Sequence, residues 1–522
     1  MLKEFATLLA YFRKYRFHYM AGVGFLVLTN FGQIAIPQFI KQAVDMVTGG
    51  AINMRSIGTS VLWIVILAVA VAIGRFGWRI FLLGVSRKVE KGLREEIFSK
   101  LLKLSSTFFG KMKTGDILAR ATNDMDNVRS ASGWALISAI DGIFMTIAIL
   151  IIIFSQYPKL ALLTILPLPI ITILVLGMGK ALGTRFRKVQ EAFAGVSAHV
   201  QEALSGIRVI KSFVREKYTQ EKFEERNDFF LKRNMSLVRI WGFFFPLITF
   251  LTGLTALLLL RFGGVAVIEG NLTAGEFVAF LAYLEMLAWP MLGAGFTVNI
   301  IQRGGASLGR INAILREEPD IQGPDNGLES FADMAIEVRN LSYTYPETGE
   351  QVLDDVSFNI PEGTIFGILG RTGSGKSTLI RCLPRLLDPP QGSVTIGGTE
   401  IHEYDLSFLR SSIGMVQQET FLFSATVKEN IAFGFPDAGE DAIFKAAALS
   451  TIDRDLRDFP AGYETEVGER GITLSGGQKQ RIAISRAILV NPEILVFDDA
   501  LSAVDAETEA SILSEFLEKR KG

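Results

Sequence analysis

Cysteine is almost absent from this sequence, since Cys382 is the single cysteine among 522 residues. A disulfide framework is therefore excluded, and the composition fits a reducing compartment. An excess of one charge is also missing, because 53 Lys and Arg residues nearly balance 54 Asp and Glu residues. This balance gives no indication of nucleic-acid binding, and we expect no nucleic-acid partner. The first residues lack an apolar core followed by a small-residue cleavage site, which argues against a signal peptide.

Apolar sequence, by contrast, is abundant. Hydrophobic residues make up 49% of the chain, charged residues only 20%, and there are 39 phenylalanines. Long apolar runs fill the chain up to about residue 317, and six of them approach the roughly 20 residues that a bilayer-spanning helix needs. The predicted spans lie near 18–47, 56–84, 133–156, 159–180, 240–263 and 274–301. Only residues 156–158 separate the third span from the fourth, which predicts a tight hairpin.

The basic residues predict the orientation of these spans. Lys and Arg are frequent in 87–129 and 180–239 and rare in the loops near Gly49, Tyr157 and Gly270. The positive-inside rule therefore places both termini and both basic segments in the cytoplasm. Their helical periodicity favours helices that continue out of the membrane, the alternative being soluble loops. The first sixteen residues predict an amphipathic helix on the membrane surface, whose basic face holds Lys3, Arg13, Lys14 and Arg16.

Three ionisable residues, Asp141, Arg261 and Glu285, interrupt the apolar runs. Arg261 lies at a helix end, where its side chain can reach the interface. Intramembrane charges are candidates for function. Asp141 and Glu285 therefore either line a substrate cavity or pair with polar groups of neighbouring helices.

The sequence changes character after about residue 317, where short β-type runs alternate with helical patterns. The run 370–377, GRTGSGKS, matches the phosphate-loop pattern G-x-x-x-x-G-K-[ST]. We expect a strand at 365–369 before it and a helix from Ser377 onward. Backbone N–H groups of such a loop surround phosphates, Lys376 neutralises the β- and γ-phosphates, and Ser377 holds Mg²⁺.

A second motif is the apolar run 494–497 followed by Asp498 and Asp499. It predicts a buried parallel strand with a carboxylate at its C-terminal end, the edge at which ligands bind in such sheets. Asp498 is therefore a candidate Mg²⁺ ligand.

The pentapeptide LSGGQ at 474–478 completes a set that resembles the ATP-binding cassette (ABC) exporters, in their half-transporter form. The resemblance spans the whole chain, which is similar to subunits of bacterial heterodimeric multidrug exporters. It implies a six-helix, all-α transmembrane domain at 1–316, a linker at 317–335 and an α/β P-loop ATPase domain at 336–522. Segments 108–128 and 201–216 resemble the family's cytoplasmic coupling regions.

The resemblance also implies roles for individual residues. Tyr345 resembles the aromatic that stacks on adenine, Gln418 the glutamine beside Mg²⁺, and Asp505 the D-loop aspartate. Two cassettes close head to tail on ATP, so the signature of one chain binds the γ-phosphate held by the other. The implied catalytic residues are Asp499, Gln418 and Lys376, and the implied Mg²⁺ ligands are Ser377, Gln418 and Asp498. The implied ATP-binding residues are Tyr345, Gly370, Arg371, Thr372, Gly373, Ser374, Gly375, Lys376, Ser377, Thr378, Gln418 and Asp498, with Ser475, Gly476, Gly477, Gln478 and Asp505 acting on the partner's nucleotide.

Asp499 departs from the family pattern, which has Glu there as the general base. Asp is one methylene shorter, and a misplacement of about 1 Å can cost about 10²-fold in rate. We therefore expect slow hydrolysis at this chain's own site and favour a heterodimer, with a homodimer as the alternative. All three histidines, His18, His199 and His402, precede Asp505. The family's switch histidine follows the D-loop, so we expect the ATPase domain to be incomplete at its C-terminal end.

The predicted function is ATP-driven export of a small hydrophobic or amphipathic substrate across the cytoplasmic membrane. ATP and Mg²⁺ are the expected cofactors, and a second half-transporter, the bilayer and the substrate are the expected partners. An ATP-gated channel or regulatory subunit reuses the same fold and stays open as an alternative. Import is disfavoured because the family's importers usually carry the two halves on separate chains. The six spans argue against a soluble ATPase that acts on nucleic acid.

Overall fold

The computed structural model describes residues 2–49, 54–346, 348–468 and 474–519, and its contacts divide the chain into two units. The helical unit comprises Met1–Leu101 and Gly115–Arg316, and the α/β unit comprises Leu102–Thr114 and Glu317–Gly522. A short piece of the N-terminal half therefore packs with the C-terminal half of the chain.

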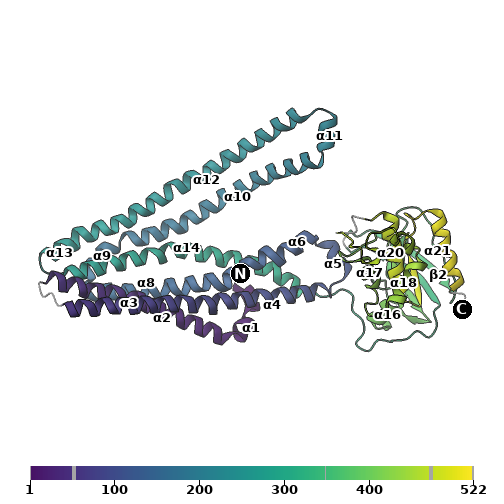
Figure 1. Cartoon of the computed structure of the whole chain (residues 1–522), viewed down its shortest axis with the longest axis horizontal. Coiled ribbons are helices and arrows are strands. Elements are labelled where there is room, and N and C mark those ends of the chain that lie inside the picture. The colour runs from purple at the N-terminus through teal and green to yellow at the C-terminus, as the bar shows by residue number, and fades with distance from the viewer. Residues whose placement is uncertain (1, 50–53, 347, 469–473, 520–522) are drawn as a thin grey trace. The chain divides into compact units, whose positions relative to one another are not determined.

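The helical unit consists of long helices joined by short turns (Figure 1). Several consecutive helices are connected through π-helical segments, which keep the helix continuous: η2 (Arg79–Leu83), η3 (Arg120–Asp124), η4 (Ala131–Ala135) and η5 (Leu259–Gly263). The α-helices are α1 (Ala6–Lys14), α2 (Arg16–Thr48), α3 (Met54–Trp78), α4 (Gly84–Leu101), α6 (Thr114–Ala119), α7 (Met125–Ser130), α8 (Leu136–Gln156), α9 (Pro158–Ile165), α10 (Pro167–Ser205), α11 (Ile207–Ser212), α12 (Glu216–Leu258), α13 (Gly264–Ile268) and α14 (Ala274–Arg316).

The prediction of six membrane-spanning helices is confirmed. The described residues contain 6 helices that are long and apolar enough to cross a membrane. Tyr157 alone separates α8 from α9, as expected for the tight hairpin. The six candidate spans are Arg16–Thr48, Met54–Leu101, Thr114–Gln156, Pro158–Val175, Glu216–Ile268 and Ala274–Arg316.

The predicted helical extensions are also present. Helices α4, α10 and α12 continue well past the apolar stretches, and α10 and α12 contact each other along an antiparallel pair closed by α11 (Figure 1). The alternative of soluble loops is therefore wrong for these segments. Extended helices satisfy their own backbone hydrogen bonds, so they can project from a membrane without a supporting sheet.

Apolar side chains lie both inside and outside the helical unit. Ile149, Leu259 and Leu287 are fully buried within one cluster drawn from several of the helices. Ile143 and Phe250, on spanning helices, are instead 62% and 64% exposed. Exposed apolar surface on this scale is typical of a face that contacts lipid.

The ionisable residues of the spans differ in their surroundings. Asp141 on α8 lies beside the amide of Asn30 on α2 and the guanidinium of Arg75 on α3. Asp141 is therefore surrounded by polar groups from two neighbouring helices. Glu285 is exposed, and the Arg261 guanidinium lies 5.9 Å from the ring centre of Phe262.

The expected N-terminal helix forms as α1. Its apolar residues Leu8 and Tyr11 are buried against the protein, and the Tyr11 hydroxyl donates a hydrogen bond of 2.7 Å to Glu96. The apolar face of this helix therefore packs on the bundle.

The α/β unit contains two sheets. The antiparallel sheet has the strand order β2-β1-β3-β4, and β5 pairs with β6 in a parallel sheet. The strands are β1 (Ile336–Thr344), β2 (Gln351–Ile360), β3 (Val394–Ile396), β4 (Thr399–Glu400), β5 (Ile413–Val416) and β6 (Ile494–Phe497). The helices are α5 (Ser106–Lys111), α15 (Lys376–Cys382), α16 (Leu406–Ser412), α17 (Val427–Ala432), α18 (Glu440–Leu449), α19 (Ile452–Leu456), α20 (Gly476–Leu489) and α21 (Ala506–Lys519).

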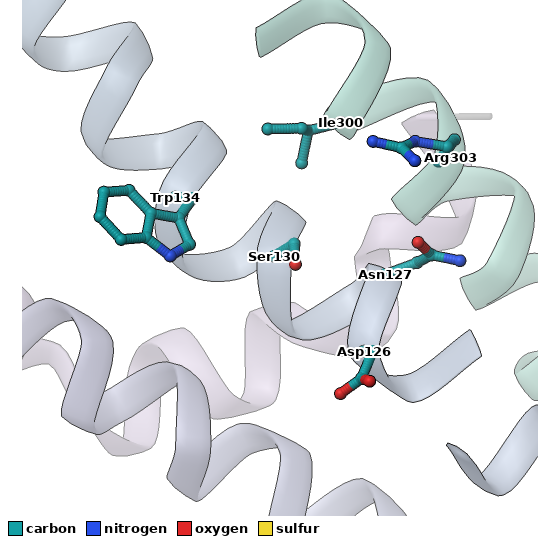
Figure 2. Close-up of a pocket in the computed structure, with 6 residues that line it drawn as sticks. All are labelled: Asp126, Asn127, Ser130, Trp134, Ile300 and Arg303. Carbon is teal, nitrogen blue, oxygen red and sulfur yellow. The ribbon is translucent and has the colours of Figure 1, made fainter. Parts of the chain in front are cut away.

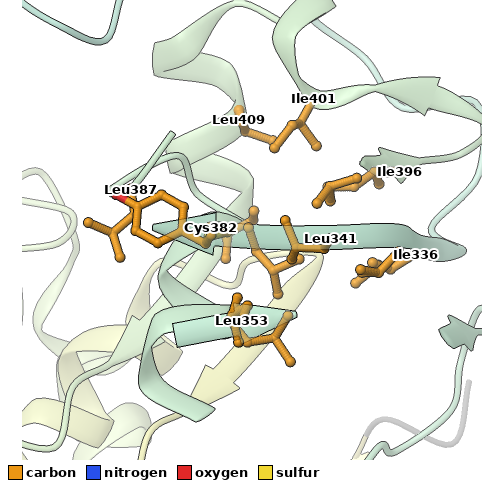
Figure 3. Close-up of a cluster of buried hydrophobic side chains, with 14 of the residues drawn as sticks. Ile336, Leu341, Leu353, Cys382, Leu387, Ile396, Ile401 and Leu409 are labelled. Carbon is orange, nitrogen blue, oxygen red and sulfur yellow. The ribbon is translucent and has the colours of Figure 1, made fainter. Parts of the chain in front are cut away.

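One core lies beside the antiparallel sheet (Figure 3). Ile336 and Val338 of β1 point into it, because successive side chains of a strand face opposite sides, and after a register shift Leu341 and Tyr343 do so as well. Leu341 of β1, Ile396 of β3 and Cys382 of α15 are each fully buried there. Burial raises the pKa of the Cys382 thiol to about 12, so this thiol is protonated at neutral pH. The core fixes the position of α15 relative to the sheet.

A second core is helical and surrounds α20. Val427 of α17, Ile443 of α18 and Ile482 of α20 are buried in it. On its other side α20 contacts β5, so α20 links the helical core with the parallel sheet.

The strand predicted at 365–369 is wrong. The structure has no strand there, and Ile365 and Leu369 are 79% and 101% exposed. A strand requires a neighbour for its N–H and C=O groups, and no described strand pairs with this segment. The segment is apolar, but no described strand supplies the pairing on which a strand depends.

Candidate nucleotide-binding site

The phosphate loop turns directly into α15. Gly373 and Gly375 have φ values of 83° and 89°, which glycine adopts without strain. A Cβ on Gly375 would also lie 2.8 Å from Leu353 and 3.0 Å from the carbonyl of Val352. Glycine is therefore required at this position, and α15 starts from it without a side-chain cap.

Lys376 folds back over the loop. Its ammonium group donates hydrogen bonds to the carbonyl oxygens of Gly370 and Arg371, at 2.8 and 3.0 Å. The Ser374 N–H also donates to the Arg371 carbonyl, at 3.1 Å. The loop residues Gly370, Arg371, Thr372, Gly373, Ser374 and Gly375 thus form one closed turn that the lysine crosses.

Ser377 and Asp498 lie together at the end of β6. The Ser377 hydroxyl donates a 2.8 Å hydrogen bond to Asp498 Oδ1. Asp498 is 6% exposed, and its Oδ2 atom is buried without a hydrogen-bond partner among the described residues. A buried carboxylate oxygen without a partner is costly, which makes this atom a candidate ligand for a cation.

Gln418 and Asp499 meet across the parallel strand pair. Gln418 follows β5, Asp499 follows β6, and the Gln418 amide donates to Asp499 Oδ2 at 3.3 Å. Asp499 has a φ of 52°, a left-handed conformation that is uncommon outside glycine. Strained backbone of this kind persists where surrounding structure enforces it, often at functional sites.

Tyr345 lies beside the same helix. Its hydroxyl is 3.1 Å from Thr378 Oγ1, and its ring meets Tyr343 edge-on at 5.3 Å. The structure therefore gathers six predicted residues at the N-terminal end of α15 and just beyond the C-terminal ends of β5 and β6: Tyr345, Lys376, Ser377, Gln418, Asp498 and Asp499.

The signature segment begins α20. Ser475 is its N-cap: its hydroxyl accepts from the N–H of Gln478, whose side chain accepts from the N–H of Ser475. A Cβ on Gly477 would lie 2.7 Å from the carbonyl oxygen of Ala503, whereas Gly476 is less confined. Glycine at 477 therefore allows α20 to approach the turn after β6.

The signature contacts Asp455 through Gln478 and approaches the 502–503 turn at Gly477. The Gln478 amide donates to Asp455 at 3.1 Å, and Arg481 forms an ion pair with the same carboxylate at 2.6 Å. Asp505 caps α21, since it accepts from the N–H of Thr508, and this bond holds the pKa of Asp505 below its ordinary value. The structure thus keeps the signature with the D-loop segment.

Sequence reasoning missed two residues that hold this arrangement. Gln480 is 6% exposed, donates to Ser502 at 3.1 Å and accepts from the N–H of Ala503 at 2.9 Å. Asp455 anchors Gln478 and Arg481. A polar residue two positions after the signature, on the apolar side of α20, could have indicated Gln480, whereas nothing in the sequence points to Asp455.

Segment 102–114 attaches to the α/β unit through α5. Ser105 and Thr107 donate to the Asp320 carboxylate at 3.1 and 2.5 Å, and Ser106 donates to the Leu386 carbonyl at 2.6 Å. The hydrogen bond from Thr107 lowers the pKa of Asp320. We call this set, Ser105, Ser106, Thr107, Asp320 and Leu386, the α5 clasp.

The donor set fits a nucleotide and its divalent cation. Ser377, Gln418 and Asp498 present only oxygen ligands, which Mg²⁺ prefers, and Asp498 Oδ2 has no other described partner. The N-terminus of α15 offers uncapped N–H groups beside a lysine, which suits phosphate. The fold and this site together define a membrane protein with a P-loop nucleotide-binding domain.

Comparison with known proteins places this class more closely. The protein-family model described as "ABC transporter transmembrane region" matches residues 19–291, and the family model described as "ABC transporter" matches residues 353–502. The chain is 38% identical to the probable multidrug resistance ABC transporter ATP-binding/permease protein YheI of Bacillus subtilis, over 98% of the chain and 88% of that protein. It is also 38% identical to the multidrug resistance-like ATP-binding protein MdlA of Escherichia coli, over 98% of the chain and 87% of the relative.

A solved structure shares the fold. The structure of a bacterial Atm1-family ABC exporter with ATP bound matches with a TM-score of 0.80 and 25% identity, over 96% of this chain and 89% of the other. The chain belongs to the ABC transporter family and has the exporter half-transporter architecture. It is a multi-pass membrane protein with a cytoplasmic ATPase domain, and it couples ATP hydrolysis to export.

Proposed function

We propose that this chain is one half of a heterodimeric exporter and that its own phosphate-loop site binds ATP but hydrolyses it slowly. The observation that carries the proposal is Asp499. Its carboxylate lies at the end of β6, bound at 3.3 Å by Gln418, where the longer side chain of Glu would reach further into the site. The shortfall of about 1 Å reduces the rate by about 10²-fold when the group positions the attacking water.

The proposal gives the remaining side chains the roles that the family resemblance implies. Lys376 exchanges its two carbonyl partners for the phosphates of ATP, and Tyr345 stacks on the base. Ser377, Gln418 and Asp498 would hold Mg²⁺, which would supply positive charge beside the phosphates. The phosphates are surrounded by Thr378 and by the loop residues Gly370, Arg371, Thr372, Gly373, Ser374 and Gly375. Ser475, Gly476, Gly477, Gln478 and Asp505 contact the nucleotide of the partner chain.

The intact signature supports the heterodimer. Ser475 and Gly477 lie at the start of α20, which supports the proposal that this chain completes a site on a partner. A partner with Glu at the position of Asp499 then hydrolyses ATP efficiently, while the site on this chain mainly holds it. A homodimer would instead contain two slow sites.

The substitution Asp499→Glu tests the proposal. We expect purified full chain to bind ATP in both forms, and turnover to rise by up to about 10²-fold in the variant. ATPase is measured for the chain alone and after co-purification with a second half-transporter. Asp437→Glu, an exposed aspartate away from the site, is the matched control. An unchanged rate together with a fully active Asp499 homodimer would refute the proposal.

The substrate is proposed to be small and hydrophobic or amphipathic. The relatives YheI and MdlA are named as multidrug resistance proteins, and the helical unit of this chain exposes extensive apolar surface. Flux in proteoliposomes distinguishes export from a channel. Accumulation of a hydrophobic dye against its gradient, dependent on ATP, supports export, and flux that only dissipates the gradient supports the channel.

A further inference from the structure

A pocket of about 240 Å³ opens within the helical unit, between the π-helical start of the third span and the end of the sixth (Figure 2). Both segments lie toward the cytoplasmic ends of their spans, since the first follows Thr114 and the second precedes Arg316. The volume is slightly below the roughly 300–1,000 Å³ of sites that enclose a whole drug-sized ligand. A pocket of this volume can hold one end of such a ligand. The lining residues are Asp126, Asn127, Ser130, Trp134, Ile300 and Arg303.

Arg303 gives this pocket an unbalanced positive charge. Among the described residues, no carboxylate forms an ion pair with its guanidinium, which is directed toward the pocket in Figure 2. The one acid in the lining, Asp126, is already paired with Arg129 at 2.8 Å. Arg303 is therefore free to bind an anionic group, and its planar donors match carboxylate, sulfonate or phosphate.

The wall opposite Arg303 is aromatic and polar. Trp134 is 51% exposed, stands edge-on to the buried Trp78 at 6.3 Å, and turns its indole nitrogen toward Ser130 (Figure 2). The Asn127 amide donates to Ser307 at 3.1 Å, which fixes that side chain and leaves its carbonyl oxygen available. An indole across the pocket from an unpaired guanidinium favours a ligand with a flat apolar group joined to an anion.

We propose that this pocket binds the anionic end of an amphiphilic ligand, with its ring against Trp134 and Ile300 and its anion on Arg303. This deepens and rests on the proposed function, because such a ligand would be an exported substrate entering from the cytoplasmic side. The proposal narrows the substrate class to amphiphiles that carry a negative charge.

The test is calorimetric binding of 2-naphthalenesulfonate to the full chain in nanodiscs of neutral phosphatidylcholine, without nucleotide. The cation (2-naphthylmethyl)ammonium is the matched ligand with a similar ring and the opposite charge. Arg303→Gln should weaken binding of the sulfonate about tenfold or more, as expected for loss of a charge-assisted hydrogen bond. Arg303→Lys should retain binding within a few fold, and Asp126→Asn should strengthen it because a negative charge is removed.

Arg233→Gln is the control, since this exposed arginine on α12 faces the ring of Phe229 at 4.7 Å and lies outside the pocket. Equal binding of the sulfonate by wild type and Arg303→Gln, or equal affinity for the ammonium ligand, would overturn the proposal. Displacement of the sulfonate by phosphatidylglycerol in the nanodisc would assign the pocket to a lipid headgroup and overturn the substrate assignment. Loss of ATP-driven export with binding intact would contradict only the proposed function.

Discussion

The phosphate loop and the signature both begin a helix, but they begin it differently. Helix α15 starts from Gly375 in a left-handed conformation, and no side chain caps it. Helix α20 starts from Ser475 with a complete capping box. The first helix leaves N–H groups for an outside anion, whereas the second already satisfies its own.

This difference agrees with the proposed roles of the two segments in binding ATP. An uncapped N-terminus with Lys376 beside it gains most from a bound phosphate, so nucleotide should bind there first. The signature is stable without ligand, and its Gln478 N–H to Ser475 Oγ bond is long, at 3.3 Å. In the proposed dimer, the γ-phosphate held by a second cassette would therefore replace a weak contact at little cost.

The largest effect is expected at Lys376. Lys376→Met removes the cation that crosses the phosphate loop, and ATP turnover should fall by about 10²- to 10³-fold, as for loss of a preorganised charge donor. Steady-state ATPase and photolabelling with an azido-ATP analogue measure the change. Lys445→Met, at an exposed lysine of α18, should leave both unchanged. If Lys376→Met were labelled as strongly as the wild type, α15 would not bind ATP more readily than α20 through its lysine, and the proposed difference between the two helix starts would be wrong.

Ser475→Ala tests the other side of the comparison. Loss of the N-cap should destabilise α20 by about 1 kcal/mol. Loss of the phosphate contact in trans should lower the ATPase of the assembled dimer about tenfold or more. Labelling of this chain's own loop should persist, because Lys376 and Ser377 are untouched. If Ser475→Ala abolished ATP binding to its own chain, the assignment of the signature to a partner's nucleotide would be wrong.

Gly477→Ala should have a smaller effect, on stability. The added Cβ would meet the Ala503 carbonyl at 2.7 Å, and such overpacking costs about 1–3 kcal/mol. Gly476→Ala is the matched control, since its nearest contact is the Ala503 side chain at 3.3 Å. Thermal unfolding of both variants in detergent compares them. Equal stability would mean that α20 can move away from the 502–503 turn.

Much of the fold was predictable from the sequence, because its determinants are local. Apolar runs of sufficient length specify the spanning helices, and the phosphate loop specifies the start of α15. The run before Asp498 also forms the expected parallel strand. The strand at 365–369 was not predictable in the same way, because a strand forms only when a neighbour pairs with it.

Long-range polar contacts account for the rest of the difference. Asp455 meets the signature from 23 positions away in the chain, and Asp320 meets Thr107 from 213 positions away. No local pattern marks either aspartate, since single carboxylates occur throughout the exposed surface. The hydrogen bond between Gln418 and Asp499 is not among the predictions, since it joins residues 81 positions apart that follow two different strands.

The smallest expected effect concerns the α5 clasp, which is attached to the turn after α15, the helix that follows the phosphate loop. Ser106 binds the carbonyl of Leu386, four residues beyond the end of α15, and no described contact of the clasp reaches α20. The pKa of Asp320 is lowered, mainly by the hydrogen bond from Thr107. The clasp is therefore stabilised while Asp320 is ionised, above its ordinary pKa, and is lost as pH falls through its lowered folded pKa.

Asp320→Asn should reproduce part of this loss at neutral pH. We expect faster hydrogen exchange in segment 102–114 and in the turn after α15, by a few fold, with exchange in α20 unchanged. Glu318→Gln, a neighbouring acid with no described partner, should leave exchange in both segments as in the wild type. Faster exchange in α20 as well would mean that the clasp stabilises the whole α/β unit, and the two helix starts would then respond together to movement of segment 102–114.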